Sequence, residues 1–184
     1  LTVDTDGCLR PGTSAEDLAG LKLAFDENGS VTAGTSSPLT DGAAATLVCS
    51  ETYAQENGLE PIARIKSIAV SGCKPETMGL GPIFASRKAL ARAELSADAI
   101  DVVEINEAFA TQSIASVRDL DLDIDKVNID GGAIAIGHPL GATGARITGK
   151  AAQLLKREGA RYALSTQCIG GGQGIATVLE TVGT

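Results

Sequence analysis

The sequence predicts an α/β fold in which a mixed, five-stranded sheet carries helices on both faces. Short apolar runs alternate with helical patterns along the 184 residues in the order β-α-β-α-β-α-β-β, and no helix separates the last two strands. Aromatic residues make up only 3% of the chain and 22 residues are glycine, so Ala, Val, Ile and Leu must build the core. Small side chains favour closely packed layers of helices against a sheet.

The first 30 residues are dominated by turn-forming types, as in "DTDGCLRPGTS". A short helix is expected over 14–25, with Ser14 as its N-cap. The chain begins with Leu1 instead of methionine, which suggests a processed or partial chain. We therefore expect residues 1–30 to be the tail of an upstream region or a linker, and residues 31–184 to form the main domain.

The regular pattern begins after Gly42. The first half of the domain is expected to contain four elements: a buried strand over 43–50 ("AAATLVCS"), a helix over 50–60, a strand over 61–72 and a helix over 81–95. In the last of these, Pro82 suits the first helical turn. One inner face of this helix can be shared by Ile83, Ala89, Leu90 and Ala93.

The second half is expected to begin with a strand over 100–106 and a helix over 107–120. An acidic loop over 121–128 follows, whose end can begin another strand. The remaining elements are a helix over 141–159, closed by a glycine, and two strands over 161–168 and 172–182 that form a hairpin through a glycine run.

Charge and cysteine content exclude several classes of protein. The net charge is −8 and no basic stripe is present, so no nucleic-acid partner is expected. A local patch for a polyanion remains open, but a solvated charged face is favoured for its candidate residues, Arg64, Lys66, Arg87, Lys88 and Arg92.

The four cysteines form no CxxC pair, so neither a zinc site nor a disulfide scaffold is expected, and a reducing, cytoplasmic location is favoured. No apolar run approaches the length of a membrane helix, and no signal peptide is visible. We expect no metal and no membrane partner.

Three short stretches concentrate polar groups near strand ends, where α/β sheets usually bind ligands. They are "NEAFA" at 106–110, "GHP" at 137–139 and "CIGGGQG" at 168–174. His138 is the only histidine of the chain, and Cys168 is followed by glycines whose N–H groups suit an oxyanion hole. A cysteine near an imidazole can have a pKa below its usual value of about 8.5. The structural alternatives are a histidine held in a tight turn and an inert, buried cysteine.

Asn106 closes a strand and precedes a helix, so it can be an N-cap, or its amide can hold a water or a substrate carbonyl. Glu107 can favour the helix dipole or hold His138 by a hydrogen bond.

Together these stretches resemble one family. "NIDGGAIAIGHPLGATGARI" and "TQCIGGGQGIATVLE" resemble the two C-terminal signature motifs of thiolases, and "NEAFA" resembles a third element of that half. "SVTAGTSSPLTDGAAATLV" and "MGLGPIFASRKAL" are also similar to thiolase sequence at the matching places. The resemblance implies a thiolase-like C-terminal half over 31–184, preceded over 1–30 by the end of the family's loop domain.

The resemblance also implies a chemistry. Thiolases cleave 3-ketoacyl-CoA with free CoA, or condense two acyl-CoA molecules, and coenzyme A is a substrate, with no separate cofactor. By motif, His138 corresponds to the activating histidine and Cys168 to the acid/base cysteine. Asn106 would form one oxyanion hole with His138, and the amide of Gly170 would contribute to the other. Two further residues match positions at the CoA site, Ser37 at the pantetheine arm and Met78 in the lining.

The nucleophilic cysteine of the family belongs to an N-terminal half, and Cys8, Cys49 and Cys73 do not lie in sequence that resembles its signature. The chain is therefore expected to pair with an N-terminal thiolase half, in a complete enzyme that is a homo-oligomer. In "SSPLTDG", Pro38 and Thr40 stand where many members have Gly and Asn. Two alternatives stay open: a CoA-binding or assembly module without chemistry, and an unrelated glycine-rich domain in which "CIGGGQG" cradles a phosphate. The sequence has no GxGxxG motif after its first expected strand and no P-loop lysine, which argues against the phosphate-binding alternative.

Overall fold

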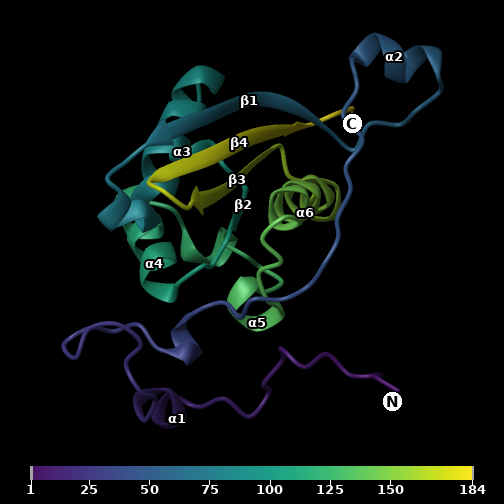
Figure 1. Cartoon of the computed structure of the whole chain (residues 1–184). Coiled ribbons are helices and arrows are strands. Elements are labelled where there is room, and N and C mark those ends of the chain that lie inside the picture. Colours follow the sequence, from purple (N-terminus) through teal and green to yellow (C-terminus); the bar gives the residue numbers. More distant parts are fainter. Residues whose placement is uncertain (1, 184) are drawn as a thin grey trace.

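A computed structural model describes residues 2–183. Its centre is one mixed sheet of four strands: β1 (Ala63–Gly72), β2 (Val102–Ile105), β3 (Tyr162–Ile169) and β4 (Gln173–Thr181). Their order across the sheet is β1-β4-β3-β2 (Figure 1). The pairs β1–β4 and β4–β3 are antiparallel, and β3–β2 is parallel. The predicted mixed sheet with a C-terminal hairpin is therefore confirmed.

Helices α3 (Gly81–Ala93) and α6 (Thr143–Glu158) pack on opposite faces of this sheet. Neighbouring residues of one strand point to opposite faces. Accordingly, Val103 and Leu164 belong to the buried cluster of α3, whereas Val102 and Ala163 belong to that of α6. The α3 cluster contains several alanines, which lets this helix approach the sheet closely. The predicted helices on both faces are confirmed, as is the inner face of α3.

The remaining helices are short, apart from α4 (Ala110–Asp119), which follows β2 and touches α3. They are α1 (Ala15–Ala19), α2 (Glu51–Glu56), α5 (Ala133–Ile136) and the 3-10 helices η1 (Ala33–Thr35), η2 (Pro75–Leu80), η3 (Ala97–Ala99) and η4 (Ile124–Lys126). Ser14 and Ser50 cap α1 and α2 as predicted, since each side chain accepts a hydrogen bond from a first-turn N–H.

The expected strand over 43–50 is wrong, and the sheet has four strands instead of five. This stretch is extended but fully exposed, and no described segment pairs with it. It crosses the molecule beside α6 and leads to the projecting helix α2 (Figure 1). An apolar, β-prone sequence forms a strand only where a partner supplies hydrogen bonds. The expected strand after the acidic loop is also absent, because η4 occupies that place and only Val127 forms a single bridge, to Val103.

The N-terminal segment runs along the end of the sheet where β2 stops. Residues 36 and 39 form isolated bridges with Phe109 and His138. Helix α1 is much shorter than the expected 14–25, since Gly20 ends it. Phe25 instead meets Phe109 edge-on, with 6.5 Å between ring centroids. Two of the predicted motifs, "NEAFA" and "GHP", are thereby contacted by residues 25–39.

Candidate active site

Asn106 and His138 form the centre of the candidate site. The backbone of Asn106 extends the parallel pairing beyond β2, since its N–H donates to the carbonyl of Thr166 at 3.0 Å. Its side chain is fully buried and places Nδ2 3.3 Å from Nε2 of His138. The amide oxygen Oδ1 has no hydrogen-bond partner within the described residues 2–183. Helix α4 begins only at Ala110 with Phe109 as N-cap, so the interpretation of Asn106 as a helix cap is wrong.

Three segments hold His138 in place. Its N–H donates to the carbonyl of Pro38 at 2.9 Å, and its ring Nδ1 lies 2.7 Å from Oγ1 of Thr143, the first residue of α6. The preceding Gly137 has φ 91°, and a Cβ there would lie 2.4 Å from a methyl carbon of Thr40. Only glycine fits this position, for both reasons. The glycine before His138 is thus a requirement of the turn that aims the imidazole.

The surroundings of His138 favour the neutral form of its imidazole. Burial lowers the pKa of His138, and the positive charge of Arg146 lowers it further. A neutral imidazole can act as a base and as a hydrogen-bond donor, one role for each ring nitrogen.

Glu107 does not hold His138, so that expectation is wrong. Its carboxylate accepts from Nδ2 of Asn128 at 2.6 Å and from the N–H of Ile134 at 3.1 Å. Asn128 also clamps the end of β2, because its Oδ1 accepts from the N–H of Ile105 and its Nδ2 donates to the carbonyl of the same residue. A Cβ on Gly132 would lie 2.2 Å from the Glu107 carboxyl carbon. This network connects the end of β2, which Asn106 follows, to the start of α5, which precedes His138.

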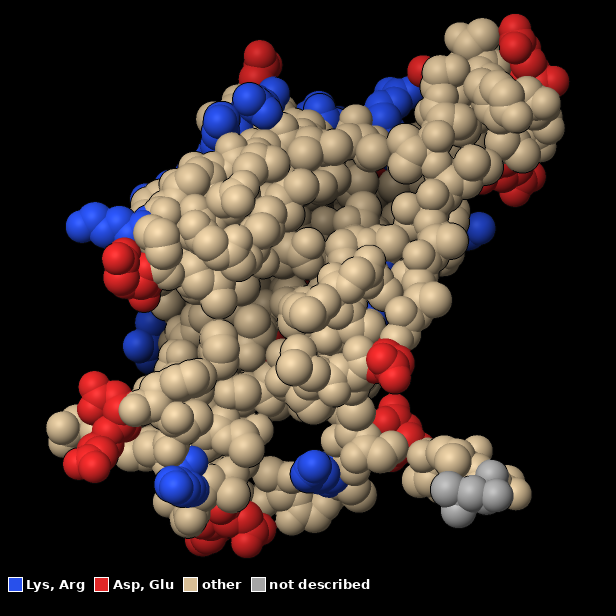
Figure 2. All heavy atoms as spheres, in the orientation of Figure 1, with Lys and Arg blue, Asp and Glu red and all other residues tan. Residues whose placement is uncertain are grey.

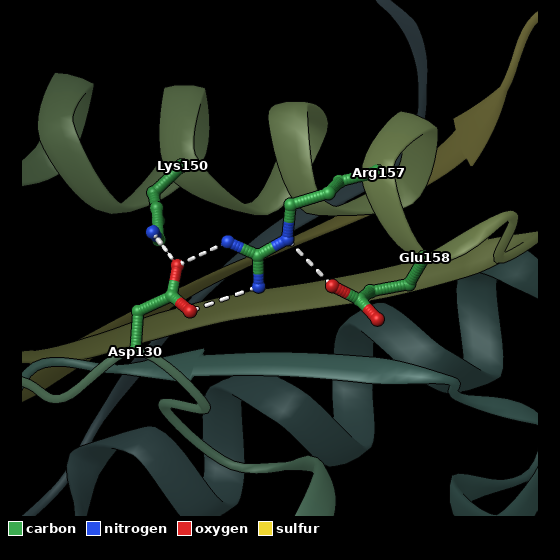
Figure 3. Close-up of polar contacts among 4 residues, drawn as sticks. All are labelled: Asp130, Lys150, Arg157 and Glu158. Carbon is green, nitrogen blue, oxygen red and sulfur yellow. Dashed lines mark hydrogen bonds and ion pairs between the residues drawn. The ribbon is translucent and has the colours of Figure 1, made fainter.

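The loop that carries Asn128 is fastened to α6 by ion pairs (Figure 3). Asp130 accepts from both terminal nitrogens of Arg157, at 2.7 and 2.8 Å, and also from Lys150. Arg157 in turn donates to Glu158 at 2.6 Å. These hydrogen bonds from two cations hold the pKa of Asp130 well below its ordinary value. The site loop and α6 therefore share one charged network on the surface.

Cys168 lies near the end of β3, at the same edge of the sheet as Asn106, and pairs with Gly174 of β4. No hydrogen bond among residues 2–183 joins it to His138. Burial raises the pKa of its thiol, and the nearby Cys73 raises it further, which is the opposite of the lowered value expected beside an imidazole. Gly170 is exposed in the turn between β3 and β4.

The two expected substrate-binding residues lie on different sides of this edge. The backbone N–H and hydroxyl of Ser37 both point to the carbonyl of Ala108, at 3.1 and 3.4 Å, beside the "NEAFA" turn. Met78 is partly buried in η2, a segment that contacts both α4 and β3.

No role at the site was predicted from the sequence for four buried or half-buried residues: Glu104, Asn128, Thr143 and Arg146. Glu104 is 1% exposed, and desolvation raises its pKa from 4.5 to about 7 despite the nearby Lys150 and Arg146. The sequence did contain one signal for Glu104, because an acidic residue is unusual in an otherwise apolar strand such as "VVEIN". In the described part of the chain, two buried nitrogens of Arg146 and one oxygen of Glu104 have no hydrogen-bond partner.

The five basic residues considered for a polyanion are engaged by the protein. Arg64 pairs with Glu51 at 3.2 Å, Arg87 with Asp119 at 2.6 Å, and Lys66 lies 3.9 Å from Glu180. Lys88 and Arg92 donate to backbone carbonyls of β1. Blue atoms gather at the β1–α3 end in Figure 2, whereas the face between β1 and α6 is largely uncharged. The interpretation as a solvated charged face is therefore favoured.

Within residues 2–183, no group of three His, Cys, Asp or Glu side chains is arranged to hold a metal ion. In the same part of the chain, no helix has the length and apolar character needed to cross a membrane.

Sequence comparison matches the chain to two models of one family. The model described as "Thiolase, C-terminal domain" matches residues 59–181, and the model described as "Thiolase, N-terminal domain" matches residues 1–52. The two matches meet between residues 52 and 59, just before β1.

The 3-ketoacyl-CoA thiolase of Cronobacter sakazakii is 57% identical over 183 residues, which is 97% of this chain and 47% of that protein. The enzyme of the same name from Vibrio vulnificus is 54% identical over 183 residues, again 97% of this chain and 47% of that protein. The chain thus spans about half the length of these relatives.

Solved structures agree. Human mitochondrial 3-ketoacyl-CoA thiolase in complex with CoA superposes with a TM-score of 0.90 and 46% identity, over 99% of this chain and 46% of that one. Acetyl-CoA acetyltransferase of Bacillus anthracis gives a TM-score of 0.92 and 47% identity, over 96% of this chain and 45% of that one. By sequence and by fold, the chain belongs to the thiolase family.

Proposed function

We propose that this chain supplies the C-terminal half of the active site of a thiolase, which transfers acyl groups between CoA thioesters. The observation that carries the proposal is the buried contact between Asn106 and His138 at the edge of the sheet, with 3.3 Å between Nδ2 and Nε2. Relatives of more than half identity are named 3-ketoacyl-CoA thiolases, which favours thiolysis of a 3-ketoacyl-CoA. Condensation of two acyl-CoA molecules is the reverse of the same chemistry.

His138 has two tasks in this proposal. Its neutral ring takes the proton from the nucleophilic thiol of the N-terminal half, and the thiolate attacks the 3-keto carbonyl of the substrate. The resulting imidazolium, together with the Asn106 amide, then stabilises negative charge on a thioester oxygen. Loss of one preorganised donor of this kind typically raises a barrier by roughly 3 to 4 kcal/mol.

Cys168 supplies the second proton transfer. Breaking the bond between the α and β carbons leaves an enolate of acetyl-CoA, which needs a proton on carbon. A thiol with a raised pKa is protonated at neutral pH and can donate to that carbon. The amide of Gly170 stabilises the oxygen of the acyl intermediate. CoA then releases the acyl group, and Ser37 and Met78 contact its pantetheine arm.

An N-terminal half completes the enzyme, and the uncovered surfaces of the chain support this. On the α6 side of the sheet, Ile68 and Val70 of the edge strand β1 are each 44% exposed, and Leu47 and Val48 of the extended segment are also exposed. A cavity of about 160 Å³ opens beside them, lined by residues of α6, β3 and β4. This is the largely uncharged face of Figure 2. An N-terminal half of similar fold covers it, and the complete enzyme forms a homo-oligomer.

The test is turnover of acetoacetyl-CoA and CoA by this chain combined with an N-terminal half. His138→Ala and Asn106→Ala should each lower kcat at least 100-fold, whereas Arg87→Ala, on the far side of α3, should leave it unchanged. Unchanged turnover by His138→Ala would contradict the proposal.

A second candidate is a CoA-binding or assembly module without chemistry. It is favoured by the likeness of the chain to a thiolase that was solved in complex with CoA. Calorimetric titration of the 184-residue chain with CoA separates the two. Tight binding together with no turnover in the presence of any N-terminal half supports the module.

A further inference from the structure

Asn106, His138 and Thr143 form one continuous chain of hydrogen-bonded side chains. Nδ2 of Asn106 lies 3.3 Å from Nε2 of the imidazole, and Nδ1 of the imidazole lies 2.7 Å from Oγ1 of Thr143. The same oxygen lies 3.1 Å from the carbonyl of Pro139. The chain therefore runs from the amide, through the ring and the hydroxyl, to a backbone carbonyl.

The direction of this chain follows from its last bond. A hydroxyl has a single proton, and a carbonyl can only accept. When Thr143 donates that proton to Pro139, its oxygen can only accept from the ring, so Nδ1 carries the proton and Nε2 keeps its lone pair. The Asn106 amide then donates to this lone pair. In the opposite direction, Thr143 would donate its proton to Nδ1, and its contact with the carbonyl of Pro139 would have no proton.

Thr143 is itself rigidly held. It is the first residue of α6 and is fully buried, and its backbone N–H also donates to Pro139, at 3.0 Å. Valine has nearly the same shape and would fill the same space without a polar atom. The hydroxyl therefore has a use beyond packing, and among residues 2–183 its only side-chain partner is the imidazole.

We infer that Thr143 is a positioning residue that holds His138 in the tautomer with Nδ1 protonated, so that Nε2 carries the lone pair with which the ring acts as a base. The inference rests on the proposed function for its catalytic meaning, but the tautomer itself is a property of this chain. Third groups that fix a histidine tautomer are a general device of nucleophile activation.

The test uses nitrogen NMR, which is unambiguous because the chain has one histidine. With 15N-histidine incorporated, we expect the ring of the 184-residue chain at pH 8 to show Nδ1 protonated and Nε2 unprotonated. Thr143→Ser should retain this pattern, and Thr143→Val should shift the ring toward Nε2–H. Overlay of the backbone amide spectra shows whether each variant is folded. An Nε2–H ring in the unaltered chain, or the same tautomer in a folded Thr143→Val variant, would overturn the inference.

Turnover of the complete enzyme separates this inference from the proposed function. Thr143→Val should lower kcat roughly 10-fold or more and Thr143→Ser should restore it, because general-base catalysis of this kind contributes about 100-fold or more. A changed tautomer with unchanged kcat would leave the tautomer inference standing and contradict the proposed role of His138. If Thr143→Val does not fold, the tautomer of the unaltered chain and the activity of Thr143→Ser decide alone.

Discussion

Asn106 and His138 are 32 residues apart in the sequence, yet their side chains meet with 3.3 Å between Nδ2 and Nε2. Asn106 follows the last residue of β2, and His138 stands in the turn between α5 and α6. Their meeting depends on Asn128 and Glu107, which connect the end of β2 to the start of α5. Glu107 belongs to the "NEAFA" motif, whereas its partner Asn128 lies outside the three short motifs.

The charge of Arg146 should be measurable at His138. Arg146→Met removes a positive charge that lowers the pKa of the imidazole, so this pKa should rise toward its ordinary value of 6.5 while burial still holds it below. Arg146→Lys keeps the charge and is the matched control. The measurement is an NMR titration of the single histidine. An equal pKa in the two variants would show that Arg146 does not act through its charge.

Glu104 should make stability depend on pH. In the folded chain its pKa is about 7, above the ordinary 4.5, so between these values the folded state binds more protons than the unfolded state. Stability therefore falls as pH rises from about 4.5 to 7 and is level above that, with a total loss on the order of 3 kcal/mol.

Glu104→Gln should abolish this fall and raise the free energy of unfolding at pH 8. Urea denaturation at pH 5.5 and 8 checks it, and the exposed Glu60→Gln serves as control. A fall of equal size in Glu104→Gln would assign the pH dependence to another group.

Asn128→Ala should destabilise the fold by about 1 to 3 kcal/mol, because it leaves the N–H and carbonyl of Ile105 buried without partners. Asp130→Asn, in the same loop, should cost less, since its ion pairs are about one-third exposed. Urea denaturation of both variants gives the comparison. A larger loss for Asp130→Asn would show that the charged network of Figure 3 holds the loop instead.

The thiol of Cys168 should react slowly with iodoacetamide at pH 7.5. Burial raises its pKa, so little thiolate is present, whereas Cys49 is exposed on the extended segment. Peptide mass spectrometry over time should find Cys49 alkylated at least about 10-fold faster. Equal rates would mean that Cys168 is more accessible or more acidic than its surroundings indicate.

Local patterns were sufficient to predict the central elements. The strand over 61–72 and the helix over 81–95 were recognised because their apolar residues repeat with the periods of a half-buried strand and an amphipathic helix, and both elements lie where expected. The strand predicted over 43–50 does not form, and the reason is physical. Its composition is that of a strand, but a strand also needs a partner, and no described part of the chain supplies one.

The candidate site was predictable only as a set of motifs. Asn106, His138 and Cys168 were recognised from three short stretches, and the first two meet in the structure. The roles of Glu107 and Thr143 could not be inferred, because each depends on a contact made in space. Glu107 accepts a hydrogen bond from Asn128, which lies 21 residues further along the chain. Thr143 is a common kind of residue at the start of a helix, and its role becomes visible only in the contact of its hydroxyl with the His138 ring.

In the proposed function, this chain provides half of a thiolase active site and the other half carries the acyl group. The most direct measurement is the intact mass of every polypeptide in the native preparation, before and after addition of acetoacetyl-CoA. We expect an acyl adduct on a second chain, or on a longer form of this one, that disappears in the His138→Ala variant. An adduct on the 184-residue chain itself would contradict it, because a thiol of this chain would then be the nucleophile.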